Sequence, residues 1–222
     1  MPFDRRRHHR QGGRNLVARL ILVRHGETEW NKLARYQGQT DIELNETGIR
    51  QAHRAAERLA RENVQTIYSS DLKRARATAE IIALKNPNVH TVHSTPLLRE
   101  MHFGDFEGLT FDQIEERYQL IFSASPSWRS RGPQVRAPNG ESIADLARRV
   151  DRFWEEVRER LGEETILIVA HGGPLQVLIC RLLGIGLEHW WQIRLSGASI
   201  SILDTHPQGA SLALLNSTSH LE

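Results

Sequence analysis

A short apolar run that ends in charged residues constrains this chain more than any other feature. Residues 20–23 read Leu-Ile-Leu-Val, and Arg24, His25 and Gly26 follow directly. A continuous apolar run bounded by polar residues is typical of a strand buried on both faces of a parallel sheet. Open α/β sheets bind their ligands beyond the carboxyl ends of such strands. We therefore expect Arg24 and His25 at the mouth of a crevice, where Gly26 lets the backbone turn.

The same pattern occurs a second time. Residues 165–170 read Thr-Ile-Leu-Ile-Val-Ala, and His171 and Gly172 follow. If both runs are parallel strands of one sheet, their carboxyl ends bring His25 and His171 to the same edge. Either histidine alone would more often be structural. Two histidines beside Arg24 favour a phosphate, which a guanidinium binds through paired hydrogen bonds and an imidazole can attack.

Between these two runs, strands alternate with helices, which is the pattern of a sheet covered on both faces. Three helices are predicted to begin at cap residues: one from Asn45 to about Glu62, one from Thr110 to about Tyr118, and one from Ser142 to Leu161. Two more are predicted from Ser69 to Leu84 and over residues 175–183. Short strands are predicted at residues 66–68 and 89–92, and an edge hairpin at residues 199–203 and 212–215. The predicted fold is a three-layer α/β/α arrangement with a mostly parallel central sheet and an edge hairpin.

The length and composition are those of one globular domain. The chain has 222 residues, 39% of them hydrophobic and 25% charged, which are ordinary values for a domain with one core. We expect the domain to span residues 16–215, with a lid segment at about 101–140. Residues 1–15 are expected to form a flexible basic tail, and residues 216–222 a C-terminal tail.

Composition also excludes several classes of protein. The single cysteine, Cys180, excludes a disulfide framework, and no apolar stretch approaches the length of a membrane span. The basic run at residues 5–10 does not open a signal peptide, because Arg19 interrupts the apolar stretch and no small-residue cleavage site follows. The net charge of only +2 argues against nucleic-acid binding. We expect a cytoplasmic protein without nucleic-acid or membrane partners, and leave open whether it forms a homodimer.

Two further charged residues are candidates for the site. Arg74 falls in the first turn of a predicted helix, where the helix dipole disfavours a cation and a bound phosphate would compensate. An exposed helix arginine is the alternative. Glu100 precedes a loop that contains Met101 and Phe103, and desolvation there would favour the protonated form that a general acid requires. A solvated loop glutamate is the alternative.

Taken together, these blocks resemble the histidine phosphatase superfamily. They are Arg24-His25-Gly26 with Asn31, Ser70-Asp71-Leu72-x-Arg74-Ala75, Leu98-Arg99-Glu100 with Phe103-Gly104 and Glu107-Gly108, and His171-Gly172. The likeness runs from about Leu20 to Asp204 and is to the branch with cofactor-dependent phosphoglycerate mutases and α-ribazole-type phosphatases. It implies a phosphoglycerate mutase-like fold.

The resemblance implies a metal-independent phosphomonoester hydrolase that acts on a small phosphorylated metabolite and needs no cofactor. A neutral His25 would attack the phosphorus and form a phosphohistidine. Arg24, Arg74 and a protonated His171 would hold the nonbridging oxygens, whose charge must be stabilised in the transition state. Glu100 would protonate the leaving group and then activate water. No residues have the spacing of metal ligands.

Five further residues are predicted to contact the phosphate or the substrate. Asn31 and the backbone N–H of Gly172 would add hydrogen bonds to the phosphate oxygens. Gln37 and Gly38 belong to the stretch that borders the phosphate in related enzymes. His102, two residues beyond Glu100, is a candidate substrate contact.

Two other functions compete with hydrolysis. A phosphoglycerate mutase would use the same phosphohistidine, but mutases of this branch carry a longer insertion between Glu100 and Gly140. Here that segment is shorter, and Arg129 and Arg131 could either meet an acidic substrate or be solvated residues of a lid. The second rival, a non-catalytic phosphate-binding protein, is disfavoured by the intact set of His25, Glu100 and His171.

Overall fold

Six strands form one mixed sheet in the computed structural model, which describes residues 18–118, 133–160, 162 and 164–222. The strand order is β3-β2-β4-β1-β5-β6. The bounds are β1 Ala18–Arg24, β2 Thr66–Ser70, β3 Val92–Thr95, β4 Glu164–Ala170, β5 Ile200–His206 and β6 Gly209–Ser217. The first four strands of that order run parallel to one another. Strand β5 is antiparallel to β1, and β6 is antiparallel to β5. The predicted α/β sheet with an edge hairpin is confirmed.

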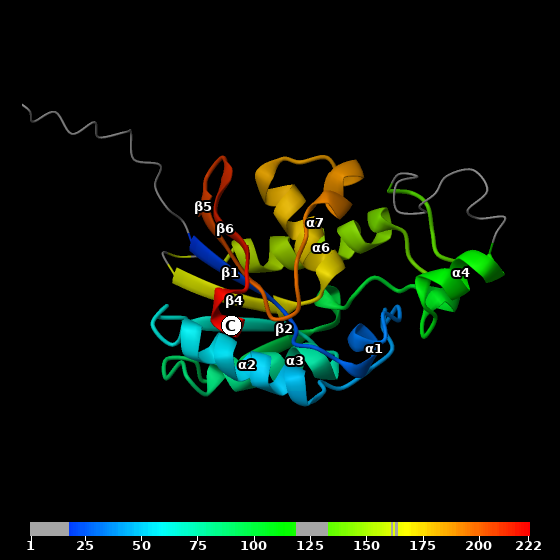
Figure 1. Ribbon diagram of the computed structural model, residues 1–222. Coiled ribbons are helices and arrows are strands. Elements are labelled where there is room, and N and C mark those ends of the chain that lie inside the picture. The colour runs from blue at the N-terminus through cyan, green and yellow to red at the C-terminus, as the bar shows by residue number, and fades with distance from the viewer. Residues whose placement is uncertain (1–17, 119–132, 161, 163) are drawn as a thin grey trace, which may run out of the picture.

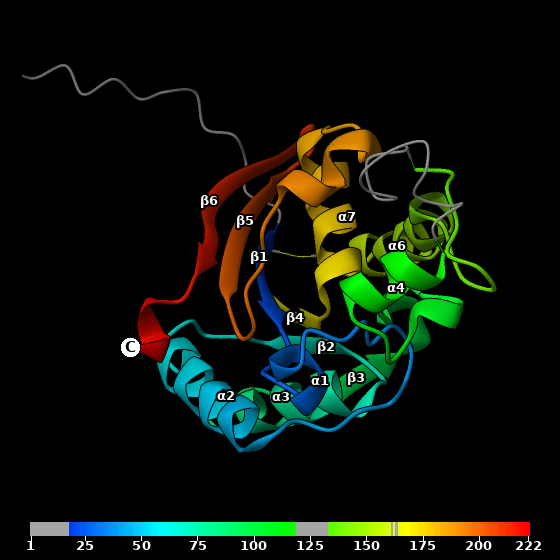
Figure 2. The same ribbon diagram turned by 45° about the vertical axis from the view of Figure 1, so that its right-hand side comes forward.

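Helices cover both faces of the sheet (Figures 1 and 2). The helices are α1 Glu29–Lys32, α2 Glu46–Leu59, α3 Lys73–Ala83, α4 Phe111–Arg117, α6 Ile143–Arg158 and α7 Gly172–Leu183. Short 3₁₀ turns are η1 Pro96–Leu98, η2 Gly104–Phe106, η4 Leu187–Gln192 and η5 Ser219–Leu221. One apolar core joins α2 and α3 to one face of the sheet. The other core joins α4, α6 and α7 to the opposite face.

Local sequence explains where the main helices begin. Asn45 accepts a hydrogen bond from the N–H of Gly48 at the start of α2, and Ser142 forms a capping box with Asp145 at the start of α6. Thr110 caps α4 in the same way. The capped helices place their apolar residues on the sheet, which supplies most of their stability.

Three parts of the chain differ from the prediction. Helix α3 begins at Lys73 and not at Ser69, because residues 69 and 70 continue the strand β2 beside β3 and β4. The third strand begins at Val92, not at residue 89, because the N–H of Val89 is bonded to the carbonyl of Asn86 in a turn. The predicted C-terminal tail is ordered structure: β6 runs to Ser217, and η5 follows it. There the Nε2 atom of His220 lies 3.0 Å from the carbonyl oxygen of Ala198.

Two predictions fall outside the described residues. These are the flexible basic tail at residues 1–15 and the contact of Arg129 or Arg131 with an acidic substrate. Within the described part of the chain, no helix is long and apolar enough to cross a membrane.

The packing of α6 on the sheet predicts a stability effect. Phe153 is buried, and its ring meets that of Tyr68 edge-on at a centroid distance of 5.5 Å. Replacing Phe153 by Ala leaves a cavity, so the free energy of unfolding should fall by about 3–5 kcal/mol in urea titration. The control Leu84→Ala, at a side chain that is 80% exposed, should change it by about 0.5 kcal/mol or less. Equal losses for the two variants would contradict this packing.

Candidate active site

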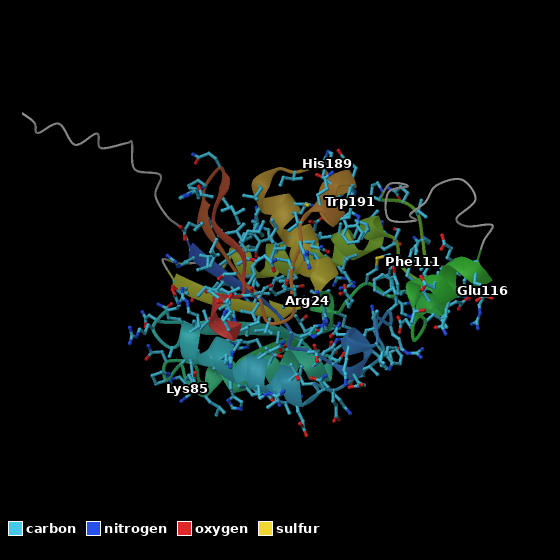
Figure 3. All side chains as sticks on the ribbon, viewed as in Figure 1. Arg24, Lys85, Phe111, Glu116, His189 and Trp191 are labelled. Atoms are coloured by element: carbon cyan, nitrogen blue, oxygen red, sulfur yellow. The ribbon has the colours of Figure 1, made fainter. Side chains whose placement is uncertain are left out.

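The site begins where β1 and β4 end side by side. These strands pair in parallel with Arg24 opposite Ala170, so the next residues, His25 and His171, are neighbours. Their ring centroids are 5.0 Å apart. Arg24, at the end of β1, lies between the two helical layers (Figure 3). The sequence prediction that both histidines meet at one edge of the sheet is therefore confirmed by the geometry.

His25 is a buried imidazole with one ring nitrogen bonded to the backbone. Its Nδ1 atom lies 2.7 Å from the carbonyl oxygen of Gly26, and an acceptor there fixes the proton on Nδ1 and leaves the lone pair on Nε2. Burial lowers the pKa of His25 well below its usual value, and the charges of Arg74 and Arg24 lower it further. A neutral imidazole with a free Nε2 is the reactive form.

His171 is a neutral imidazole before a ligand binds. Burial lowers its pKa well below the usual value, with smaller contributions from the charges of Arg74, His25 and Arg24. The protonated His171 of the prediction concerns the site with phosphate bound. Neither ring nitrogen has a hydrogen-bond partner among the described residues. A buried polar group without a protein partner is a place where a water molecule, an ion or a ligand can bind.

Two arginines supply positive charge. The Nη1 atom of Arg24 donates to the carbonyl of Leu195 at 2.7 Å. Arg74, fully buried in the first turn of α3, donates from Nη1 to the carbonyl of Thr40 and from Nη2 to that of Gly38. Burial lowers the pKa of Arg74 to about 10, so its guanidinium keeps its charge at neutral pH. These contacts exclude the alternative that Arg74 is an exposed arginine on the helix surface.

The carboxyl group of Glu100 is held by backbone N–H groups. Its Oε1 atom accepts hydrogen bonds from the N–H of Met101 at 2.8 Å and from the N–H of Gly173 at 3.1 Å. Gly173 belongs to the first turn of α7, so the carboxyl group sits at the N-terminus of the helix that His171 caps. Glu100 is thus part of the cavity and not a solvated loop residue.

The predicted secondary contacts are brought to the same place, with one exception. Asn31, Gln37, Gly38 and Gly172 all line the cavity. The Oδ1 atom of Asn31 is taken by Thr28, which leaves the amide N–H groups to bind an anion. His102 does not line the cavity, because its ring turns toward Glu107, with Nε2 3.7 Å from Oε1.

The cavity that these residues surround has a volume of about 270 Å³. Among the described residues that line it, three are arginines (Arg24, Arg35 and Arg74) and the one carboxylate is Glu100. Such an excess of positive charge favours an anionic ligand. Sequence reasoning missed the outer wall, which consists of Arg35, Tyr36, Gln176, Trp190, Trp191 and Leu195. Only Arg35 and Tyr36, next to Gln37, could have been suspected from the sequence.

Comparisons with known proteins agree with this geometry. Residues 20–218 match the histidine phosphatase superfamily, branch 1. The chain is 36% identical to phosphoserine phosphatase 1 of Hydrogenobacter thermophilus, over 92% of this chain and 95% of the relative. It is also 36% identical to "Probable phosphoglycerate mutase GpmB" of Yersinia pestis, over 85% of each chain.

A solved structure adds the likeness of the fold. The alpha-ribazole phosphatase from Shigella flexneri is 33% identical and superimposes with a TM-score of 0.79, over 90% of this chain and 96% of that one. The match to the family covers most of the chain and includes every residue of the site described above. The chain belongs to branch 1 of the histidine phosphatase superfamily and is a phosphatase of that superfamily.

Proposed function

We propose that the protein hydrolyses phosphomonoesters of small metabolites through a phosphohistidine on His25. The observation that carries this proposal is His25, which lines one cavity together with Arg24, Arg74 and Glu100 and whose Nδ1 atom is bonded to the carbonyl of Gly26. The ring of His171 lies 5.0 Å from that of His25. A nucleophile, fixed cations and an acid within one cavity are the parts that phosphoryl transfer to a side chain needs.

In the first step, Nε2 of His25 bonds to phosphorus while the bond from phosphorus to the leaving oxygen breaks. Glu100 transfers its proton to that oxygen, so the alcohol departs neutral. Arg24 and Arg74 hold the nonbridging oxygens and need no rearrangement, because carbonyl groups already fix their guanidinium groups.

In the second step, water attacks the phosphorus of the phosphohistidine. Glu100, now ionised, takes a proton from the water, and the bond from phosphorus to Nε2 breaks. Inorganic phosphate leaves, and His25 and Glu100 return to their starting states. His171 joins the cations only once the phosphate is bound, because a dianion beside the ring raises the pKa that burial and the arginines had lowered.

The size of the cavity and the names of the relatives support a small metabolite as substrate. A space of about 270 Å³ fits a phosphate group with a small leaving group. Two relatives are named as phosphatases for phosphoserine and α-ribazole, and both phosphoserine and the phosphate of α-ribazole are esters of phosphate with an alcohol. We infer an alkyl phosphomonoester as the substrate class.

The nucleophile can be tested by trapping the intermediate. Rapid acid-free quenching with ³²P-labelled phosphomonoester should give a phosphoprotein that is stable in base and labile in acid, as a phosphoramidate is. His25→Ala should abolish both this adduct and turnover. Chelators should leave the rate unchanged, because side chains supply the positive charge. An acid-stable adduct, or full activity in His25→Ala, would overturn the proposed intermediate.

The acid can be tested through the leaving group. Glu100→Gln keeps the shape of the side chain but removes the transferable proton, so single-turnover phosphorylation by phenyl phosphate should slow by about 10²–10⁴-fold. The loss should be smaller with p-nitrophenyl phosphate, because nitrophenolate departs readily without a proton. Equal losses on the two esters would mean that Glu100 does not protonate the leaving group.

An activity assay can distinguish hydrolysis from mutase activity. One relative is named as a probable phosphoglycerate mutase, which favours the mutase. A mutase must keep water from its phosphohistidine until a second substrate oxygen accepts the phosphoryl group. We expect 3-phosphoglycerate with 2,3-bisphosphoglycerate to give little isomerisation, while a panel of alkyl phosphomonoesters yields at least one efficient release of inorganic phosphate. Isomerisation faster than phosphate release by orders of magnitude on every ester tried would favour the mutase and leave the phosphohistidine in place.

A further inference from the structure

The turn that carries Glu100 is held by a side chain outside the cavity. Arg149, on α6, is mostly buried and donates from Nη1 to the carbonyls of Leu97 and Arg99 at 3.0 and 2.5 Å. Its Nη2 atom donates to the carbonyl of Glu100 at 2.7 Å. One guanidinium therefore binds three of the four carbonyl groups between residues 97 and 100.

Glu141 fixes this guanidinium from the other side. Its carboxylate accepts from Nε and Nη2 of Arg149, both at 3.0 Å, as a two-pronged ion pair. The same carboxylate accepts the N–H of His102 at 2.9 Å. The Arg149–Glu141 pair thus holds the backbone on both sides of Glu100, from residue 97 to residue 102.

The turn that carries Glu100 has little regular structure of its own to fix its backbone. Residues 99–103 lie between the 3₁₀ turns η1 and η2 and belong to neither helix nor strand. The carbonyl of Glu100 receives one further bond, from Nε2 of Gln39 at 3.2 Å. Among the described residues, Glu100 is otherwise held through its own carboxylate, which accepts the N–H groups of Met101 and Gly173.

We propose that Arg149 is the positioning residue of the acid: by binding the carbonyls of Leu97, Arg99 and Glu100, it holds the carboxyl group of Glu100 beside the leaving oxygen. This inference rests on the proposed function. A displacement of about 1 Å in a reacting group can cost on the order of 10² in rate, so a turn without this anchor would lose proton transfer before it lost phosphate binding. The phosphate ligands Arg24 and Arg74 are anchored elsewhere, by Leu195, Thr40 and Gly38.

Arg149 could instead act only through its charge. Its positive charge contributes to lowering the pKa of His171, though less than burial and the nearer groups do. Arg149→Lys separates the two roles. Lysine keeps the charge, but a single ammonium on a flexible stem cannot replace a rigid fork that spans three carbonyls and a carboxylate.

The experiment compares Arg149→Lys, Arg149→Met and Glu100→Gln with the wild-type protein. Single-turnover phosphorylation is measured with phenyl phosphate and with p-nitrophenyl phosphate, and orthovanadate inhibition reports on phosphate binding. Both Arg149 variants should slow the phenyl ester by about 10–100-fold and the nitrophenyl ester by much less, with orthovanadate inhibition changed less than about threefold. The matched control is Arg148→Lys, on the same helix, where Arg148 pairs with Asp145 and is largely exposed. It should leave both rates unchanged.

The outcomes are distinct. If Glu100→Gln shows no preference between the two esters, the proposed acid is wrong, and the inference falls with it. If Glu100→Gln is selective but the Arg149 variants slow both esters equally, or neither, only the inference is overturned. Wild-type rates in Arg149→Lys with a loss in Arg149→Met would assign the effect to charge and overturn positioning.

A variant that does not fold is identified by its circular dichroism spectrum and melting temperature. Glu141→Gln then carries the test, because an amide oxygen still accepts one hydrogen bond but the ion pair is lost. It should show the same selective loss on phenyl phosphate, by about 3–10-fold. An unselective effect of Glu141→Gln in a folded protein would contradict the inference.

Discussion

The parallel pairing of β1 with β4 is the constraint on which the rest of the site depends. With Arg24 opposite Ala170, the residue after each strand is a histidine, and the two rings lie 5.0 Å apart. A slip of one residue would turn every side chain of β1 to the other face of the sheet. Leu20 and Leu22 would then leave the core that they share with α6 and α7. The register that buries the leucines is therefore the register that assembles the histidines.

The buried positive charge of Arg74 is stabilised by backbone carbonyls and by the charges of Glu100, Asp41 and Glu107. Arg74 has no exposed surface, and the carbonyls of Gly38 and Thr40 bind its guanidinium. That loop is fixed in turn by Glu107, whose carboxylate accepts the N–H groups of Gln39 and Thr40. Gly38 has a φ of +54°, and a Cβ atom there would collide with Glu107, so only glycine fits. Carbonyl dipoles stabilise the cation without neutralising it, which leaves its charge available to a phosphate.

The sequence predicted the parts of the site that lie at the ends of regular elements. His25 and His171 follow apolar runs, and Arg74 follows a helix start, so strand and helix patterns placed all three. Contacts between loops were beyond such reasoning, because they depend on tertiary packing: His102 turns toward Glu107, and Trp190 and Trp191 reach the cavity from η4. The neutral state of His171 in the free site was also beyond such reasoning, because burial beside two arginines, which lowers its pKa, is invisible in a strand pattern.

The groups of the site differ in what holds them, and that difference follows from their chemistry. In the proposed mechanism the nucleophile and the phosphate ligands are fixed groups, and they lie at or next to β1, α3 and α7, whose backbones are held by the sheet and the cores. In the same mechanism Glu100 exchanges a proton first with the leaving oxygen and then with water. Glu100 lies on a turn between η1 and η2. A turn has no ladder of hydrogen bonds, so side chains can supply donors to its carbonyls, and Arg149 on α6 supplies three of them.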